Sequence, residues 1–491
     1  ARHLDPKAHC DEMVLRFQSL WERLGITNDR YIRTTEEFHK RVVRQILQEL
    51  FDRGEIYKAE YTGWYCVGCE RFFTEKDLVD GKCPDCGREV SAIVESNYFF
   101  RMSSYREWLI EYIETHPDFI QPSFRANETL GFLRKGLGDL CISRPKSRLS
   151  WGIELPFDPD YVCYVWFDAL INYISGVGYL QDDAMFEKWW PASYHLIGKD
   201  IIRFHTIYWP IFLMALDLPL PKQVFGHPWL LQGDGKMSKS KGNVIYADDL
   251  VDFFGVDAVR YFVLHEMPFE NDGVITWELM VERLNSDLAN TLGNLVNRTI
   301  SMSNKYFGGV VTKTGVEEDV DADLKAVVTG TRAKVAAKME DLRVADSITE
   351  IFNLFKRCNK YIDETMPWAL AKDEAKKDRL AEVLYNLVES ITIGASLLES
   401  FMPETTEKIL AQLNGEKRSY EELDQFGLYP SGNKVTDKPE ILFQRLDLKE
   451  ILEKVEAMKA AQAKPEVPEE PVVDIDAKEE ITFDDFGKMQ F

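Results

Sequence analysis

Apolar side chains recur every three or four residues after Thr34, in the spacing of an amphipathic helix. Thr34 and Glu37 have the spacing of a capping box, and Gly54 is typical of a helix end. The stripe between them consists of Phe38, Val42, Val43, Ile46, Leu47, Leu50 and Phe51. The pattern therefore predicts a helix over residues 34–54.

Strands and helices alternate from residue 161 onward. The run YVCYVWF (161–167) predicts a buried strand that continues into a helix. SYHLIG (193–198) and KQVFGHPWLL (222–231) predict two further strands, joined by a helix that Asp200 can cap. Such a unit predicts an α/β fold with a parallel sheet, in which ligands bind at the carboxyl ends of the strands.

The pattern is helical throughout residues 280–401, which predicts a helical bundle. One more helix is predicted over residues 449–463. The segment KPEVPEEPVVDIDAKEE (464–480) holds seven acidic residues, two basic residues and three prolines, which is typical of a linker. An apolar-alternating pattern resumes in residues 481–491, and we find no internal repeat.

Charge restricts the partners that this fold can bind. The chain has 491 residues, with 59 Lys and Arg against 82 Asp and Glu, and a net charge of −23. Bulk charge therefore does not attract nucleic acid or an anionic membrane, and RNA binding requires local patches and stacking. The longest apolar run, IYWPIFLMAL (207–216), is far shorter than the roughly 18 residues that span a bilayer.

The ends of the chain and the scattered cysteines indicate a compartment. The first residues show no signal-peptide pattern. Four cysteines show no pairing pattern, namely Cys10, Cys141, Cys163 and Cys358. This usage suits a reducing environment, so we expect a cytoplasmic protein without membrane association.

The other four cysteines form two Cys-x-x-Cys pairs separated by thirteen residues. The pairs are Cys66 with Cys69 and Cys83 with Cys86. Disulfides and a redox pair are the alternatives, but two-residue spacing is poor for a structural disulfide and a redox pair normally comes singly. Four thiolates on two tight turns predict one structural Zn²⁺, and four protein ligands leave no open position for catalysis.

The run GDGKMSKSKGN (233–243) follows directly after the last predicted strand. A solvated turn is the simplest interpretation of such a run. Its position favours a functional loop, because Lys236 and Lys239 can close on the phosphates of a substrate as negative charge develops. Ser238 and Ser240 can add hydroxyl donors.

This loop contains KMSKS, the signature of class I aminoacyl-tRNA synthetases. The loop by itself leaves several synthetases open. Together with its flanks, HPWLLQGDGKMSKSKGN, it resembles the methionyl-tRNA synthetase family. The likeness continues in the same order over nearly the whole chain, in RTTEEFHKRVV, WYCVGCE, YVWFDALINY, HLIGKDIIRFH, NTLGNLVNRT and ETMPW.

Two other interpretations compete with this one. A leucyl, isoleucyl or valyl synthetase normally carries a large editing insertion. Only about 150 residues separate Cys86 from the loop, and the strands use most of them. The second is a non-catalytic, zinc-containing RNA-binding protein that kept the bundle and lost the site.

The resemblance implies which residues contact ATP and methionine. Lys236 and Lys239 are implied to be the catalytic, ATP-contacting lysines, and His227 the nearby ATP contact. The methionine pocket is implied to consist of Trp166, Ala169, Tyr173, Asp200 and His205. The chemistry suits a thioether, because aromatic rings contact sulfur favourably and the Tyr173 hydroxyl, directed by His205, can donate to it. Without the resemblance, Trp166 and His205 fit a packed core and Asp200 fits a helix cap.

The bundle is implied to read the anticodon, through Asn294, Arg298 and Trp368. Asn294 and Arg298 lie four residues apart, on one helical face. An amide and a guanidinium can bind base edges, and an indole can stack on a base. The anticodon implied is CAU. Packing at a helix start is the alternative for Trp368, since it follows Pro367.

The implied fold is α/β, with a partial class I Rossmann-type parallel sheet, a zinc-knuckle insertion and an all-α anticodon-binding bundle. The expected domains are a remnant of the first half of the nucleotide-binding fold (1–33), the insertion (34–150), the second half (151–232), the KMSKS loop with a stem-contact region (233–280), the bundle (281–463), and an acidic linker with the start of a C-terminal domain (464–491).

The resemblance also implies the reaction. Methionine and ATP, with Mg²⁺, give methionyl-adenylate, and the methionine is then transferred to the 3′ adenosine of methionine tRNA, including the initiator. The family's His-Ile-Gly-His motif and its first strand are missing from these residues. We therefore expect a fragment that is inactive in adenylate formation. A complete C-terminal domain would imply a homodimer.

Overall fold

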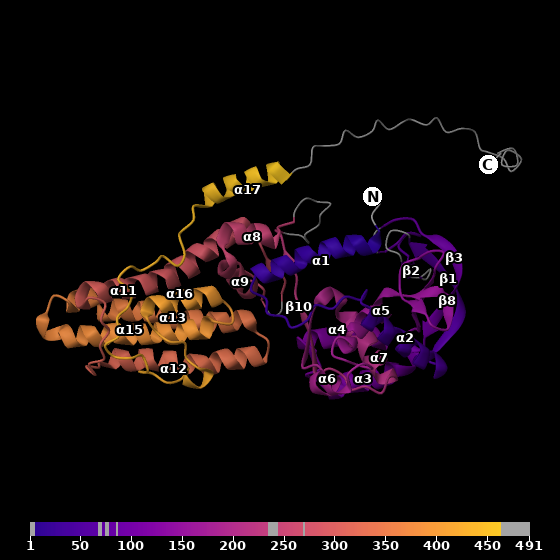
Figure 1. The fold of residues 1–491 in the computed structure, drawn as a ribbon, viewed down its shortest axis with the longest axis horizontal. Helices are drawn as coiled ribbons and strands as arrows, with labels where there is room; N and C mark the ends of the chain where they lie inside the picture. Colours follow the sequence, from indigo (N-terminus) through magenta and orange to yellow (C-terminus); the bar gives the residue numbers. More distant parts are fainter. Residues whose placement is uncertain are drawn as a thin grey trace, which may run out of the picture.

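The computed structural model describes residues 5–66, 71–73, 78–84, 87–233, 244–268 and 271–462. The chain folds into two lobes that lie side by side (Figure 1). One buried core runs from Val42 to Val224, and the second runs from Leu250 to Val455. The first core spans the predicted boundary at residue 150 and the second spans the one at residue 280, and the domain boundaries stay a prediction.

Two helices begin the first lobe, α1 (Pro6–Arg23) and α2 (Glu37–Asp52). The apolar stripe of α2 is buried as predicted, and Gly54 follows the helix in the left-handed region at φ +76°. The predicted capping box is wrong, because α2 begins three residues after Thr34. The residue at the N-cap position is Glu36, and its side chain makes no capping hydrogen bond. The Glu36 carboxylate instead accepts from the backbone N–H of Arg33 at 2.9 Å, in the turn before the helix.

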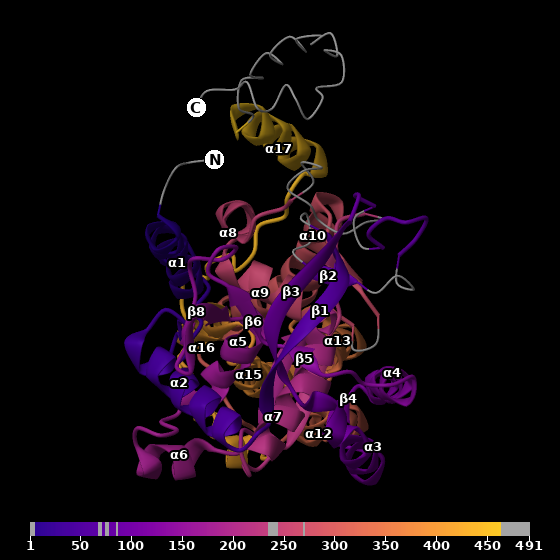
Figure 2. The ribbon, with the colours of Figure 1, turned by 90° about the vertical axis from the view of Figure 1, so that its right-hand side faces the viewer.

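Two antiparallel sheets form one side of this lobe. The long strands β1 and β3 pair with each other in the larger of the two sheets (Figure 2). One sheet has the order β2-β1-β3-β5 and the other β6-β8-β7. Their bounds are β1 (Ile56–Cys66), β2 (Arg71–Phe73), β3 (Ser91–Phe100), β5 (Leu140–Cys141), β6 (Ser143–Pro145), β7 (Glu154–Leu155) and β8 (Asp158–Cys163). The helices η2 (Met102–Tyr105), α3 (Arg106–Thr115) and α4 (Ser123–Arg134) lie between β3 and β5 in sequence.

The predicted parallel sheet is present, with the described strands in the order β4-β10-β9. These strands are β4 (Ile120–Gln121), β9 (Tyr194–Gly198) and β10 (Gln223–His227). The connection from β9 to β10 runs through η3 (Lys199–Ile201), the π-helical turn η4 (Phe204–Tyr208) and α7 (Trp209–Ala215). Strand β9 is half exposed rather than buried, since it is an edge strand whose side chains alternate between core and solvent.

The strand predicted over residues 161–167 ends earlier and belongs elsewhere. Strand β8 stops at Cys163 and pairs antiparallel with β6 and β7, outside the parallel sheet. Helix α5 (Val165–Ser175) starts at once, with Asp168 in its first turn, and burial raises the pKa of this side chain to about 7. Trp166 therefore lies on a helix. The short helix α6 (Asp183–Trp189) precedes β9.

A small parallel ladder joins the two lobes, between β11 (Leu230–Leu231) and β12 (Gly273–Val274). Helices α8 (Ala247–Phe254) and α9 (Val256–His265) lie between these strands in sequence. The predicted bundle follows, with bounds α10 (Trp277–Arg283), the π-helix η6 (Leu284–Gly293), α11 (Asn294–Phe307), α12 (Asp319–Glu340), α13 (Val344–Thr365), α14 (Pro367–Leu370), η7 (Glu374–Lys376), α15 (Lys377–Leu398), α16 (Pro403–Leu413), η8 (Tyr420–Glu422) and α17 (Leu448–Gln462).

Helix α15 is the centre of the bundle. The helical stretch Glu374–Leu398 is long and apolar enough to cross a membrane by length and composition, but all of its most apolar window is buried inside the protein. Its buried carboxylates have partners. Glu389 accepts from the backbone N–H groups of Gly427, Leu428 and Tyr429 at 2.8–3.0 Å, and from the Arg418 guanidinium at 2.9 Å. The Glu389 side chain therefore holds the loop of residues 427–429 against α15.

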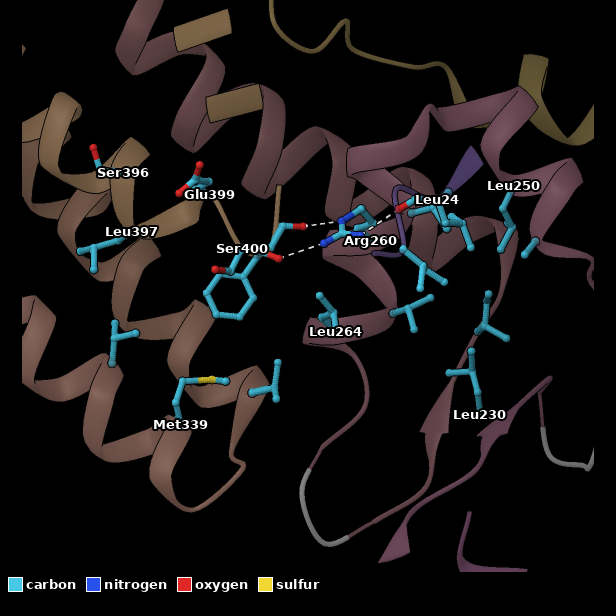
Figure 3. A pocket seen from close by; sticks show the side chains of 18 of the residues that line it. Leu24, Leu230, Leu250, Arg260, Leu264, Met339, Ser396, Leu397, Glu399 and Ser400 are labelled. Atoms are coloured by element: carbon cyan, nitrogen blue, oxygen red, sulfur yellow. Dashed lines mark hydrogen bonds between the residues drawn. The ribbon is translucent and has the colours of Figure 1, made fainter. Parts of the chain in front are cut away.

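Arg260 on α9 fastens the carboxyl end of α1 to the second lobe. Its guanidinium donates to the carbonyl oxygens of Leu24, Ser400 and Phe401 at 2.8–2.9 Å. Leu24 caps the carboxyl end of α1, and the other two residues follow the end of α15, so the cation neutralises the negative ends of two helices. A cavity of about 820 Å³ lies beside this joint and is lined mostly by apolar side chains such as Leu250 and Leu264 (Figure 3).

Replacing Glu389 should destabilise the bundle strongly. Glu389→Ala leaves the Arg418 charge and three backbone N–H groups buried without an acceptor, which costs roughly 3–5 kcal/mol. Thermal unfolding followed by circular dichroism should show a lowered transition. Glu399→Ala removes an exposed pair with Lys417 and serves as the control, with an expected change of ~0–1 kcal/mol. Equal losses in the two variants would contradict the assignment.

Candidate active site

The carboxyl ends of β9 and β10 lie next to each other. Their parallel register pairs Gly198 with His227, so the segments that follow the two strands meet at one edge of the sheet. The Asp200 side chain packs closely over Gly198, where an added Cβ atom would lie 2.6 Å from Oδ1 of Asp200 and would displace that carboxylate. The two motifs GKDI and GHPWL, which are far apart in the sequence, therefore form one site.

Asp200 does not cap the helix that follows β9, contrary to the prediction. The N-cap position is Gly198, and no side chain caps this turn. Asp200 is exposed, and its Oδ1 accepts a long hydrogen bond of 3.3 Å from the indole N–H of Trp229. The carboxylate therefore points from the end of β9 toward the end of β10.

A second pair of side chains reinforces this edge. The Lys199 ammonium donates to both oxygens of Asp272, at 2.7 and 2.8 Å. Asp272 also accepts from the backbone N–H of Trp229 at 2.9 Å, and the ammonium lies 4.4 Å from the centre of the Trp229 ring. The hydrogen bond from Lys199 is the main reason that the pKa of Asp272 is lowered.

A cavity of about 680 Å³ opens beside these strand ends. Its polar lining carries both signs of charge, with Lys199, Arg144 and Arg203 against Asp139 and Asp200. One wall consists of the Trp166 and Phe204 rings, which are stacked 3.7 Å apart at an interplanar angle of 9°. The cavity therefore suits a ligand that combines an apolar part with charged groups of both signs.

Tyr173 and His205 are brought together behind this wall, on α5 and η4. Nδ1 of His205 lies 3.0 Å from the carbonyl oxygen of Ile201, which can only accept, so Nδ1 carries the hydrogen in the neutral ring. Nε2 then accepts from the Tyr173 hydroxyl at 2.8 Å. Burial lowers the pKa of His205 and raises that of Tyr173 to about 12, so both are neutral at pH 7.

This direction differs from the predicted one. The single hydroxyl hydrogen of Tyr173 is donated to His205, so the hydroxyl presents lone pairs rather than a donor to other groups. Neither side chain lines the charged cavity, whereas Trp166 and Asp200 do. Ala169 lies one turn before Tyr173 on α5, and its carbonyl accepts from the side chain of Asn172.

His227, the predicted ATP contact, is exposed at the end of β10. Its Nδ1 donates to the carbonyl oxygen of Pro228 at 2.8 Å, which leaves Nε2 as the acceptor of the neutral ring. Lys236 and Lys239 lie outside the described residues. The chain on either side of them is placed, since β11 ends just before Gly233 and α8 begins at Ala247.

The described cysteines of the predicted zinc site are close together. Cys66 ends β1, and Cys83 lies in the turn before β3. Both are buried and form one small cluster, flanked by Trp64, Leu78 and Val90. Cys69 and Cys86 lie outside the described residues, and no group of three or more potential metal ligands occurs within the described ranges.

The predicted anticodon residues share one end of the bundle. Asn294 and Arg298 are exposed on α11, and Arg298 lies 3.8 Å from Asp363 near the end of α13. Trp368 follows on α14 and is 43% exposed, whereas its neighbour Pro367 is buried. The packing role therefore falls to Pro367, and the indole of Trp368 is available for stacking.

The parallel sheet, the site at its strand ends and the adjoining bundle define a class I aminoacyl-tRNA synthetase. The family model described as tRNA synthetases class I (M) matches residues 1–93 and 88–300. The model of the anticodon binding domain of methionyl tRNA ligase matches residues 311–462. The chain belongs to the methionyl-tRNA synthetase family.

Individual relatives agree with this assignment. The methionine–tRNA ligase of Clostridium perfringens is 51% identical over 488 residues, which cover 99% of this chain and 75% of that protein. That of Bacillus subtilis is 45% identical over 507 residues, covering 99% and 76%. A crystal structure of Mycobacterium tuberculosis methionyl-tRNA synthetase bound by methionyl-adenylate is 40% identical with a TM-score of 0.81, covering 87% of this chain and 85% of that one. These findings oppose the leucyl, isoleucyl, valyl and non-catalytic alternatives.

Some residues of the site have only a weak signal in the sequence. Lys199 stands within the GKDI run, but nothing local marks it as a partner of Asp272, which is 73 residues away. Phe204 precedes His205 and resembles an ordinary core residue. His195 is one of the buried side chains of β9. Its ring lies 4.2 Å from that of Tyr173, and its Nε2 accepts from the indole N–H of Trp209 at 3.1 Å.

Buried histidines should make the protein less stable in acid. Burial lowers the pKa of His195 to about 3, so between its ordinary value of 6.5 and 3 the unfolded chain binds a proton that the folded chain refuses. Stability therefore falls as the pH falls through this window, by up to ~1.4 kcal/mol per pH unit for this residue. His205 acts in the same direction.

Unfolding by urea at pH 7.5, 6.5 and 5.5 measures this dependence. His195→Asn removes one titrating group and should lower the slope of the free energy of unfolding against pH. An unaltered slope in His195→Asn would show that the imidazole titrates normally in the folded protein.

Proposed function

We propose that this chain carries the active site of a methionine–tRNA ligase. The methionine carboxylate attacks the α-phosphate of ATP and displaces pyrophosphate, and the adenylate then passes methionine to the 3′ adenosine of methionine tRNA, including the initiator. The observation that carries the proposal is the meeting of GKDI, GHPWL and the base of the lysine loop at the ends of β9 and β10. No covalent enzyme intermediate is needed, because positioning and charge stabilisation suffice.

The lysine loop and His227 are assigned to ATP. Lys236 and Lys239 balance the charge that develops on the phosphates, together with the Mg²⁺ that accompanies ATP. His227 supports this role, because it is exposed and the Nε2 of its neutral ring can accept a hydrogen bond from the nucleotide. The loop is preceded by β11 and followed by α8, which is held by ion pairs from Asp248 and Asp252 to Arg23.

Methionine is assigned to the region between α5 and η4. Trp166, with Phe204 behind it, supplies an aromatic wall that favours a thioether. Ala169 leaves room on the same helix, and the Tyr173–His205 pair fixes the shape of the pocket by its hydrogen bond. Asp200 is assigned a polar role at the strand ends, where it faces Trp229.

One structural zinc ion is assigned to Cys66, Cys69, Cys83 and Cys86. The two cysteines that are described fit this assignment, because both are buried in one cluster. Four thiolates would neutralise and hold Zn²⁺, which orders the turns of the knuckle. The metal has no part in the reaction.

The tRNA is assigned to the bundle. Asn294 and Arg298 can bind the edges of unpaired bases, and the exposed Trp368 can stack on one, so we expect a CAU anticodon. Local contacts of this kind let a chain of net charge −23 select an RNA. A cytoplasmic location without membrane association, and a homodimer formed through a C-terminal domain, complete the proposal.

Amino-acid-dependent ATP–pyrophosphate exchange tests the proposed reaction. The assay uses the complete reading frame that contains these 491 residues, with each of the twenty amino acids in turn. Exchange should require methionine, and charging should require a tRNA with the CAU anticodon. Exchange with another amino acid would discard the methionine pocket, and no exchange from a folded protein would favour an RNA-binding protein that has lost catalysis.

Metal analysis tests the zinc site. Protein purified without chelators should contain about one zinc ion per chain, because four thiolates bind Zn²⁺ tightly. Cys66→Ser and Cys83→Ser should each lose most of this metal and lower the melting temperature. Cys10→Ser changes a cysteine on α1 and should keep the full metal content. If removal of the metal from the wild-type protein left its melting temperature unchanged, the assignment would be refuted.

A further inference from the structure

We propose that Lys199 and Asp272 form a positioning pair that fixes the end of β10 and the base of the lysine loop for the ATP step. The pair would act on nucleotide use, and neither on the methionine pocket nor on anticodon binding. The inference rests on the proposed function, because it assigns ATP to this edge of the sheet.

The geometry of the pair is that of a built contact rather than a surface ion pair. Both oxygens of Asp272 accept from the Lys199 ammonium, and the two side chains are only 20% and 25% exposed. The ammonium also lies over the face of Trp229, 4.4 Å from its centre. An ammonium held by a carboxylate and an aromatic face has little freedom to move.

Asp272 holds the chain that leads into the loop. Its Oδ1 accepts from the backbone N–H of Trp229, two residues beyond the end of β10. The next residue, Gly273, donates to the carbonyl oxygen of Trp229 at 2.9 Å, and Ile275 donates to Leu231 at 2.8 Å. The segment from Trp229 to Leu231 is thus fastened to the 272–275 segment at successive positions, immediately before the lysine loop.

The pair also joins the two lobes. Lys199 follows β9 of the first lobe, whereas Asp272 precedes β12, which continues directly into the helices of the second. Loss of the pair would let the end of β10 shift relative to β9, and His227 and the loop would shift with it. Reactions that depend on positioned phosphates lose rate steeply on such a shift.

A direct role of Lys199 on a phosphate is the competing explanation, because Lys199 lines the charged cavity. Asp272→Asn separates the two explanations. Asparagine keeps an oxygen that accepts from Trp229 but removes the charge that holds Lys199. A lysine that contacts phosphate would be released by this change and would bind ATP at least as well, whereas a positioning pair would be broken.

Steady-state exchange kinetics of the complete enzyme test the pair with Lys199→Met, Asp272→Asn and the double variant. Each single change should lower kcat/KM for ATP about tenfold or more, with the KM for methionine within about twofold of wild type. The double variant should be no worse than the poorer single variant, since the residues act as a unit. Lys199→Arg should restore much of the activity, because a guanidinium can also bind both carboxylate oxygens.

The matched control is the exposed pair Lys146–Glu154, 2.6 Å apart and in the same lobe. Lys146→Met and Glu154→Gln should leave both substrate constants unchanged. Additive effects in the double variant, normal ATP use in Asp272→Asn, or equal losses for ATP and methionine with a lowered melting temperature would each overturn the proposal.

A second readout keeps the inference independent of the reaction. Trypsin cleaves after lysine, so the initial rate of cleavage within residues 233–243 reports how the loop is held. Both single variants should be cleaved several-fold faster there than wild type, and the control variants should not. If the wild-type enzyme fails to exchange with methionine, the proposed function fails, and the cleavage rates still decide whether the pair holds the loop.

Discussion

The parallel pairing of β9 with β10 is the constraint on which the site depends. It places Gly198 beside His227 and so brings GKDI and GHPWL to one edge of the sheet. Ligands of α/β proteins bind at such edges because the chain leaves adjacent parallel strands in the same direction. The charged cavity, the base of the lysine loop and the Lys199–Asp272 pair all follow from this register.

Charged side chains with several partners hold the rest of the molecule around that edge. Arg260 places one cation at the carboxyl ends of α1 and α15, where peptide carbonyls lack partners within their helices. Glu389 does the reverse, with one carboxylate receiving three backbone N–H groups and an arginine. Each of these side chains fixes segments that apolar packing alone would leave free to slide.

The Tyr173–His205 pair between α5 and η4 shows how burial sets hydrogen-bond direction. His205 is kept neutral, and its Nδ1–H is taken by a backbone carbonyl, so Nε2 has to accept from Tyr173. Donor and acceptor roles within the region are therefore decided by the backbone carbonyl of Ile201, at the end of η3. The π-helical turn that carries His205 and the one that precedes Asn294 both adjoin residues assigned to ligands, as such turns often do.

The sequence by itself determined the helix over 37–52, the strands around His195 and Val224, the helical bundle, the cysteine spacing and the family, because periodicity and short motifs are written in neighbouring residues. Only the tertiary structure decided that β8 leaves the parallel sheet, that Asp200 faces Trp229 instead of capping a helix, and that Lys199 meets Asp272. These outcomes depend on which distant segments pack together, and the local pattern of residues does not specify partners that lie dozens of positions away.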